Sequence, residues 1–339
     1  MTGWRNLTLA VTVVFLVILV FVPRDEMQRE TIRVVIVKYL SYAPLFIAHE
    51  EGFFEAEGLE IELLPVTGVS TAIPALVEGD VDVLPAAIMP SYFNVINRGG
   101  LMKVVAGKGY FKPEGCAYAG VMARRSLLDS GELSSASDLA GRRVSTERTS
   151  PSYFRVDQFL KSSGVALDDL EVVDVPLSAR FDAFKRGTLD VSTASEPWVT
   201  RLRLSGHAGL LASAGEFLPE FQYAYLLFGK SLLKDRPEAG ERFILAYLKA
   251  IRHLNAEGKS DRHIEIVSKY TGLEKELLAE ACWPSLRNDG RAQPQSLDKF
   301  QHWAMKQGLV SEVTPMDLLY DPSFIERANH LLAKKSGQK

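Results

Sequence analysis

The sequence has few cysteines and none of the common catalytic or nucleotide-binding motifs. Its 339 residues include two cysteines, Cys116 and Cys282, and six histidines at scattered positions. No Walker A, G-x-G-x-x-G, H-E-x-x-H, G-x-S-x-G or C-x-x-C pattern occurs, and no Cys/His spacing is typical of zinc. We therefore expect no enzyme, no catalytic residue, no metal and no cofactor. The cysteines could form one disulfide outside the cytoplasm or remain two unrelated buried thiols.

A surplus of charge of one sign is also missing. The net charge is −3, from 39 basic and 42 acidic residues, and no basic block occurs. Nucleic acid is therefore not an expected partner. With 47% hydrophobic residues, the chain can bury a large core and is long enough for two domains.

One long hydrophobic run lies near the N-terminus. Residues 7–22 carry no charge, Arg5 precedes them, and together with Trp4 they approach the ~20 residues that span a bilayer as a helix. A cleaved signal peptide would need a small-x-small site, which residues 20–23 do not supply. We therefore favour an uncleaved signal anchor, with residues from about 25 onward outside the cytoplasm.

A short internal repeat indicates two similar halves. Residues 75–83 and 183–191 share the pattern A-x-x-x-G-x-x-D-V, and each copy ends an expected helix and enters a short apolar strand. The elements expected before each copy are a strand, a helix, a strand and the helix that the copy ends. This βαβαβ order, found twice, predicts two α/β lobes with mostly parallel sheets flanked by helices.

The expected elements can be given by residue range. The strands of the first half lie at 32–37, 60–66 and 81–84, and its helices at 44–57 and 69–78; those of the second half lie at 142–146, 170–175 and 189–193, with helices at 151–163 and 178–186. Further strands are expected at 103–107, 119–124 and 222–228, and helices at 237–255, 261–270, 274–281, 297–307 and 322–334. Because residues 119–124 and 222–228 flank the second half, we expect them to be the paired crossover segments of a hinge.

Candidate ligand contacts lie where strands end and helices begin. The helices after Thr67 and Thr146 and the one near Arg180 start with Ser, Thr or Gly residues, and such helix starts can bind anions or can simply be N-capped. Glu196 and Trp198 follow the last strand of the second half. They could bind and stack a ligand, or they could be a capping carboxylate and a core indole.

Several of these stretches resemble the periplasmic substrate-binding proteins of ABC importers, in the group that binds nitrate, taurine, alkanesulfonate, bicarbonate and thiamin pyrimidine. The matching stretches are A-P-L-F-I-A-H-E-E-G-F-F at 43–54, A-L-V-E-G-D-V-D-V at 75–83, S-D-L-A-G-R-R-V at 137–144 and E-P-W at 196–198. The resemblance covers about residues 32–255. It implies a type II-like fold of two lobes that close on a small molecule. The ligand contacts that it implies, with Arg180 added from the helix starts, are Tyr42, Thr67, Gly68, Val69, Ser70, Ala87, Ile88, Thr149, Ser150, Ser152, Arg180, Glu196 and Trp198.

The resemblance also implies how the chain is divided and what it does. We expect an anchor and linker over residues 1–30, the first lobe over 31–118, the second lobe with its hinge strands over 119–228, and the rest of the first lobe with the C-terminal helices over 229–339. The expected function is a monomeric solute-binding protein, held at the bacterial inner membrane by its N-terminal helix, that delivers ligand from the periplasm to an ABC permease and its ATPase. The alternatives are an enzyme on the same fold that acts on a small aromatic or futalosine-like substrate, and a ligand-sensing partner of another membrane protein.

Two features leave the ligand open. Residues 85–90 (P-A-A-I-M-P) are more apolar than a site for a simple oxyanion requires. Glu196, Trp198 and the many Tyr and Phe residues suit a cationic or heteroaromatic ligand, whereas helix N-termini and Arg180 suit an anion.

Overall fold

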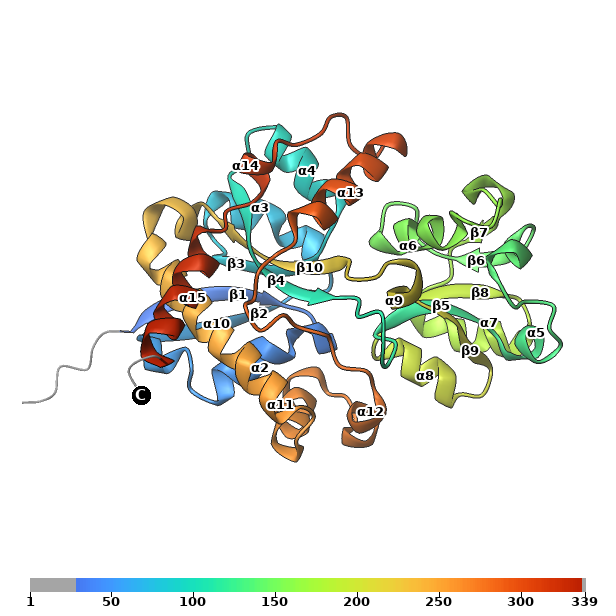
Figure 1. Ribbon diagram of the computed structural model, residues 1–339, viewed down its shortest axis with the longest axis horizontal. Coiled ribbons are helices and arrows are strands. Elements are labelled where there is room, and N and C mark those ends of the chain that lie inside the picture. The colour runs from blue at the N-terminus through green and yellow to red at the C-terminus, as the bar shows by residue number, and fades with distance from the viewer. Residues whose placement is uncertain (1–28, 337–339) are drawn as a thin grey trace, which may run out of the picture.

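The computed structural model describes residues 29–336 and has two lobes, each built on a five-stranded sheet (Figure 1). The predicted signal anchor at 7–22 lies outside these residues. Within the described range, no helix is both long enough and apolar enough to span a bilayer.

The first lobe contains the N-terminal strands and the C-terminal helices. Its sheet has the order β2-β1-β3-β10-β4. The strands are β1 (Glu30–Ile36), β2 (Leu59–Pro65), β3 (Val83–Ala87), β4 (Met102–Tyr110) and β10 (Gln222–Gly229). Its helices are α2 (Ala43–Glu50), α3 (Ile73–Glu78), α4 (Pro90–Asn97), α10 (Pro237–Glu257), α11 (Asp261–Thr271), α12 (Lys275–Glu280), α13 (Pro294–Lys306), α14 (Met316–Leu319) and α15 (Ser323–Ser336).

The second lobe repeats this plan with the middle of the chain. Its sheet has the order β7-β6-β8-β5-β9. The strands are β5 (Ala119–Arg124), β6 (Arg143–Ser145), β7 (Glu171–Val173), β8 (Val191–Ser195) and β9 (Ala208–Ser213). Its helices are α5 (Arg125–Asp129), α6 (Pro151–Leu160), α7 (Arg180–Arg186), α8 (Trp198–Leu204) and α9 (Ala214–Phe217).

The two α/β lobes agree with the prediction, but the sheets are only partly parallel. In each sheet the first three strands pair in parallel, and the fourth, β10 or β5, pairs antiparallel with both of its neighbours. The reason is the chain path, because β5 is entered from the first lobe and β10 from the second. The strand at the far edge of each sheet, β4 or β9, is antiparallel to this fourth strand and therefore runs in the same direction as the first three.

The position of the crossings also differs from the prediction. Residues 119–124 form β5 inside the second sheet, and residues 222–228 lie in β10 inside the first sheet, so neither is a crossover and the second lobe does not extend to 228. The chain crosses between the lobes at 111–118 and 218–221. These two segments run together, because the backbone N–H of Phe111 donates to Phe221 O (3.0 Å) and that of Glu220 donates to Phe111 O (2.8 Å).

The internal repeat marks the same buried joint in both lobes. Asp82 is fully buried, and its carboxylate accepts hydrogen bonds from the backbone N–H (2.7 Å) and Nε (3.2 Å) of Arg33, whose guanidinium also reaches Gly79 O at the end of α3. Asp190 accepts the same set from Arg143, whose guanidinium reaches Gly187 O at the end of α7.

Both aspartates are held ionised in the fold. Burial by itself would raise the pKa of Asp82, but hydrogen bonds from Ser231 and Arg33 outweigh it and keep that pKa below its usual value. Burial and the bonds from Arg143 oppose each other in the same way at Asp190, whose pKa is also lowered. Because folding lowers these pKa values, the two carboxylates stabilise the fold at neutral pH, and this contribution is lost as the pH falls through the lowered values.

We expect Asp82→Asn to lower the free energy of unfolding by about 3 kcal/mol, because it removes the charge that satisfies buried arginine groups. Urea denaturation at neutral pH measures the change. Asp80→Asn, two residues earlier and exposed, is the matched control and should be nearly neutral. Equal unfolding midpoints for the two variants would contradict the structural role of Asp82.

Candidate functional site

A cavity of about 540 Å³ lies between the lobes and is lined from both sheets. It opens where the parallel strands β1 and β3 of the first lobe and β8 of the second end, which is where ligands bind in open α/β sheets. Its size suits an organic molecule rather than a single small ion.

Most of the residues predicted to contact ligand line this cavity, and three do not. Those that line it are Tyr42, Thr67, Gly68, Val69, Ser70, Ala87, Ser150, Ser152, Arg180 and Trp198. Ile88, Thr149 and Glu196 are not among its lining residues. Ile88 is fully buried, directly after β3, and Thr149 is exposed ahead of α6.

The first lobe contributes a buried lysine that the sequence analysis did not identify. Lys108 on β4 is 1% exposed, its Nζ donates to Ser41 Oγ (2.8 Å), and it lies 3.7 Å from the centre of the Tyr42 ring. The Tyr42 hydroxyl in turn donates to Pro85 O, which fixes the ring. Burial lowers the pKa of Lys108 well below its usual value. The sequence signal was a lysine between two glycines, Gly107 and Gly109, in the same strand.

The second lobe contributes two arginines. Arg155 on α6 is 8% exposed and donates to Ser152 Oγ (2.9 Å) and Ser195 Oγ (3.2 Å). Arg180 donates to the carbonyls of Val175 and Thr193, at 2.9 and 2.8 Å. Burial lowers the pKa of Arg155 to about 10, so it stays protonated at neutral pH. Burial also lowers the pKa of Arg180.

None of these three basic side chains forms a salt bridge among the described residues, although the charge of Asp174 partly offsets the lowering of the Arg180 pKa. Every described salt bridge involves other groups, and the acidic residues that line the cavity, Glu147 and Asp174, are exposed at its rim. Nε of Arg155 and Oγ1 of Thr193 are buried without a hydrogen-bond partner in the described chain. A buried cation or hydroxyl is costly without a partner, so the cavity is arranged to receive negative charge and hydrogen-bond acceptors.

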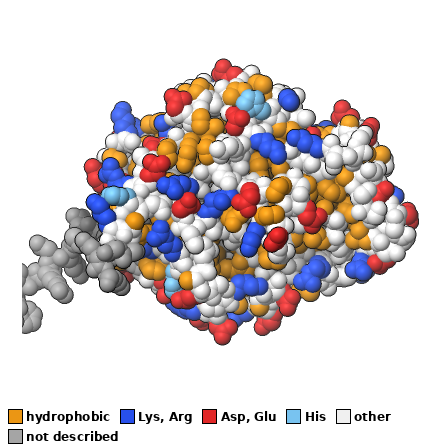
Figure 2. Space-filling model, viewed as in Figure 1, with side chains coloured by type: hydrophobic (Ala, Val, Ile, Leu, Met, Phe, Trp, Pro, Cys, Tyr) orange, Lys and Arg blue, Asp and Glu red, His pale blue; other side chains and the backbone are white. Residues whose placement is uncertain are grey.

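The outer surface differs from the cavity in its charge. On the face seen in Figure 2, acidic and basic side chains are interspersed without a large patch of one sign. This face therefore lacks the surplus of basic groups that lines the cavity.

Aromatic rings form much of the remaining wall. Tyr39, Tyr118 and Tyr223 line the cavity, and the rings of Tyr118 and Tyr223 stack with centroids 5.0 Å apart. Trp198, at the start of α8, lines it from the second lobe. Together with Ala86 and Ala87 of β3, these rings provide surface for the non-polar part of a ligand.

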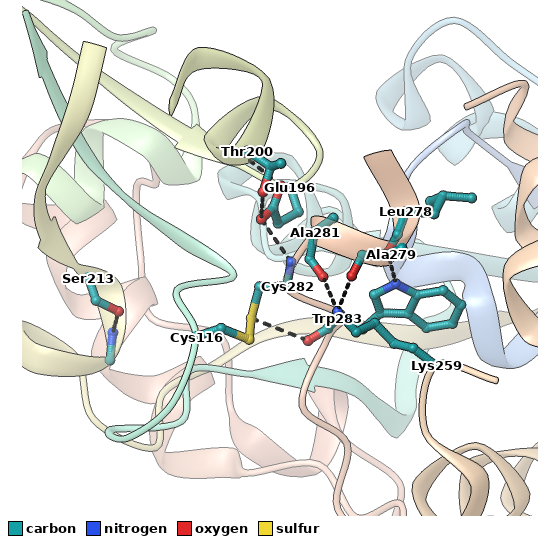
Figure 3. The surroundings of a disulfide bond; sticks show 11 residues. Cys116, Glu196, Thr200, Ser213, Lys259, Leu278, Ala279, Ala281, Cys282 and Trp283 are labelled. Carbon is teal, nitrogen blue, oxygen red and sulfur yellow. Dashed lines mark hydrogen bonds between the residues drawn. A yellow bond between two sulfur atoms is a disulfide. The ribbon is translucent and has the colours of Figure 1, made fainter. Parts of the chain in front are cut away.

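Glu196 serves the structure rather than the cavity (Figure 3). Its side chain is 1% exposed and accepts hydrogen bonds from Thr200 N (3.2 Å), Thr200 Oγ1 (2.8 Å) and the backbone N–H of Cys282 (2.9 Å). Burial raises the pKa of Glu196, and the bonds from Cys282 and Thr200 offset part of that rise. Of the two interpretations of Glu196, the capping carboxylate describes these contacts; Trp198 is the member of the pair that reaches the cavity.

The bond from Cys282 also connects Glu196 to a disulfide. Cys116, in the first crossing segment, is bonded to Cys282, which follows α12 in the first lobe. The two cysteines are thus one disulfide rather than two thiols. Glu196 belongs to the second lobe, so this carboxylate links that lobe to the disulfide-bonded corner of the first.

Comparison with known proteins identifies the family. The family model described as NMT1/THI5 like matches residues 40–258. The chain belongs to the NMT1/THI5-like family. That match includes both lobes' cavity-lining residues from Tyr42 to Ala224.

Individual relatives are distant but cover almost the whole chain. A protein of Bacillus subtilis (strain 168) that is named as a binding protein, YtlA, is 21% identical over 316 residues, which are 92% of each chain. The periplasmic nitrate-binding protein NrtA from Synechocystis PCC 6803 has a TM-score of 0.72 at 16% identity and covers 90% of this chain and 89% of its own. The desulfurization enzyme DszB has a TM-score of 0.66 at 16% identity, over 90% of this chain and 100% of its own. At such identities the solved structures share the fold of this family member.

We expect Glu196→Gln to lower the free energy of unfolding by about 2 kcal/mol, because the amide NH₂ would face an N–H or O–H donor in place of an accepting oxygen. Thermal or urea unfolding measures the loss. Glu274→Gln is the control, since that glutamate is exposed and its ion pair with Arg201 is worth little. If Glu196→Gln is as stable as Glu274→Gln, the link to Cys282 does not stabilise the fold.

Proposed function

We propose that this protein is an extracytoplasmic solute-binding protein that holds a small organic anion between its lobes and delivers it to an ABC permease and its ATPase. The observation that carries the proposal is the group of three basic side chains around one cavity, Lys108 and Arg155 buried and Arg180 half-buried, none of which forms a salt bridge in the described chain. Membership of the NMT1/THI5-like family and the likeness to a nitrate-binding protein support the same function.

The cavity further supports an anion that has an organic body. An acidic head group would accept hydrogen bonds from Arg155 Nε and Thr193 Oγ1, which are buried without partners. The rings of Tyr42 and Trp198 would contact the rest of the molecule. A sulfonate or carboxylate joined to a short apolar or aromatic group meets both requirements, and a bare oxyanion would leave much of the cavity unfilled.

An enzyme on this fold is the second candidate, favoured by the likeness to DszB. Among the described residues, the cavity lining contains no cysteine and no histidine, and both cysteines are in the disulfide. The groups that do line it, guanidinium, ammonium and hydroxyl groups, bind and orient an anion. They therefore support binding more than chemistry on the ligand.

The location rests on two features. A disulfide persists in an oxidising compartment, which supports an extracytoplasmic site. The uncharged run at residues 7–22 supports a membrane tether with the binding lobes outside, and that tether stays a prediction from the sequence.

We expect Arg155→Gln to weaken binding of an organic anion about ten- to a hundredfold, because a charge-assisted hydrogen bond is worth about 1.5–3 kcal/mol. Isothermal calorimetry against nitrate, a short alkanesulfonate, an aromatic carboxylate and a cationic pyrimidine first finds the ligand. Arg148→Gln is the control, since Arg148 is exposed, lies on the same loop–helix segment and does not line the cavity. Binding of the cation alone, or equal affinity in both variants, would contradict the proposal.

Ligand binding should also favour closure of the lobes. Lys108 lies on the first lobe and Arg155 on the second, so an anion that contacts both binds the closed arrangement more tightly. We expect small-angle scattering to give a smaller radius of gyration at saturating ligand, and Arg155→Gln to need about ten- to a hundredfold more ligand for the same change. An unchanged radius for the saturated wild-type protein would show that the lobes do not close on the ligand.

A further inference from the structure

Three potential metal ligands meet where α10 ends and α11 begins, away from the cavity between the lobes. His253 and Glu257 are one turn apart on α10, and His263 is in the first turn of α11. Their ligand atoms all lie within 4.8 Å of one another. The chain reverses between the two helices at Gly258, whose φ of 63° is easily adopted by glycine.

The buried histidine has one ring nitrogen that its surroundings do not satisfy. His263 is fully buried, and its Nδ1 lies 2.7 Å from Gly258 O. A carbonyl oxygen only accepts, so Nδ1 carries the proton and Nε2 of the neutral ring is a free lone pair. This Nε2 is buried and has no hydrogen-bond partner among the described residues.

The lone pair faces another acceptor. His263 Nε2 lies 3.8 Å from Glu257 Oε2, and the other oxygen of the same carboxylate lies 3.3 Å from His253 Nδ1. Two acceptors that face each other repel unless a positive charge lies between them. That charge is either a proton on the ring or a metal ion held by both groups.

We propose that His253, Glu257 and His263 form a Zn²⁺ site with three protein ligands and an open fourth position. Two imidazoles and a carboxylate are a donor set that suits zinc, and a tetrahedral ion with bonds of about 2.0–2.1 Å separates its ligand atoms by about 3.3 Å. The two histidine nitrogens lie 3.3 and 3.8 Å from the two oxygens of Glu257, and the three ligand atoms lie within 4.8 Å of one another, so the side chains must move closer together to hold one ion.

The neighbouring groups favour this arrangement. The bond from His263 Nδ1–H to Gly258 O is the kind of outer hydrogen bond that fixes the tautomer of a zinc-binding histidine. Phe53 packs edge-to-face on the His253 ring at 5.6 Å. The nearby Lys259 does not point at the three ligands, because its Nζ donates to the carbonyls of Ala279 and Ala281. Glu257 and His253 are partly exposed, which leaves a path for the ion and a place for a water ligand.

The position of the site indicates a structural role rather than transport of the metal. None of the three residues lines the cavity between the lobes. Both helices pack on α2, where Phe46 stacks on Tyr270 of α11 at 4.6 Å, and α2 directly follows the cavity residue Tyr42. A bound ion would hold the α10–α11 turn in place and thereby support the helix that positions Tyr42.

The test uses the full chain without an affinity tag, stripped of metal with a chelator and titrated with ZnCl₂ in a calorimeter. We expect one ion per chain, and at least a tenfold loss of affinity in Glu257→Gln and in His253→Asn. Zinc should raise the melting temperature of the wild type and of the control but not that of Glu257→Gln. The control is His302→Asn, because His302 also pairs with a carboxylate one turn away, Asp298 at 3.2 Å, but has no third ligand in the described chain.

The contribution of His263 is tested first by the spectrum of Co²⁺ bound to the wild type, which does not depend on whether a variant of this buried residue folds. Co²⁺ bound to the wild type should give the intense visible absorption of a four-coordinate ion, which His263→Gln, where it remains folded, should lose. A weak six-coordinate spectrum in the wild type would overturn the proposal, since it would mean that only the exposed pair on α10 holds the ion. Absence of zinc binding, or equal affinity in wild type, Glu257→Gln and His253→Asn, would also overturn it and leave a proton between His263 and Glu257.

Discussion

One buried carboxylate in each lobe joins the elements on which the rest of the structure depends. Asp82 ties β1 to the strand β3 and, through Arg33, to the end of α3; Asp190 and Arg143 do the same in the second lobe. A buried aspartate is stable only when donors surround it, so its position fixes the strand, the helix end and the arginine at once. The strands that start at these joints end at the cavity. The joints therefore help to set the positions of the residues that line it.

The basic groups of the cavity, unlike the buried aspartates, are not paired with groups of opposite charge in salt bridges. The aspartate joints are matched by arginines, whereas Lys108 and Arg155 are buried, and Arg180 is half-buried, beside hydroxyl and carbonyl groups and outside any described salt bridge. Burying a cation in this way lowers its pKa and destabilises the unliganded protein. Such a cost is expected at a binding site, because a ligand of opposite charge recovers it on binding.

The two lobes form one cavity because the chain passes between them twice. Each passage inserts an antiparallel strand into the middle of the other sheet, and the crossing segments are hydrogen-bonded to each other and bonded through Cys116 to the first lobe. Glu196 of the second lobe accepts a hydrogen bond from the backbone of Cys282, so the second lobe is also linked to the disulfide. The side of the cavity near the disulfide is thus held firmly.

The sequence by itself determined the two α/β lobes, the repeated joint and most of the cavity wall near helix starts, because these depend on local patterns: apolar periodicity, a glycine that ends a helix, and serine or threonine that begins one. The tertiary structure alone decided which side chains meet. Lys108 lines the cavity because its strand, β4, pairs with β10. Glu196 does not line the cavity, because its carboxylate accepts a hydrogen bond from the backbone N–H of Cys282, 86 residues away in the sequence. These contacts depend on the order of the strands in the sheet and on hydrogen bonds between residues far apart in the sequence. A local sequence pattern therefore cannot predict them.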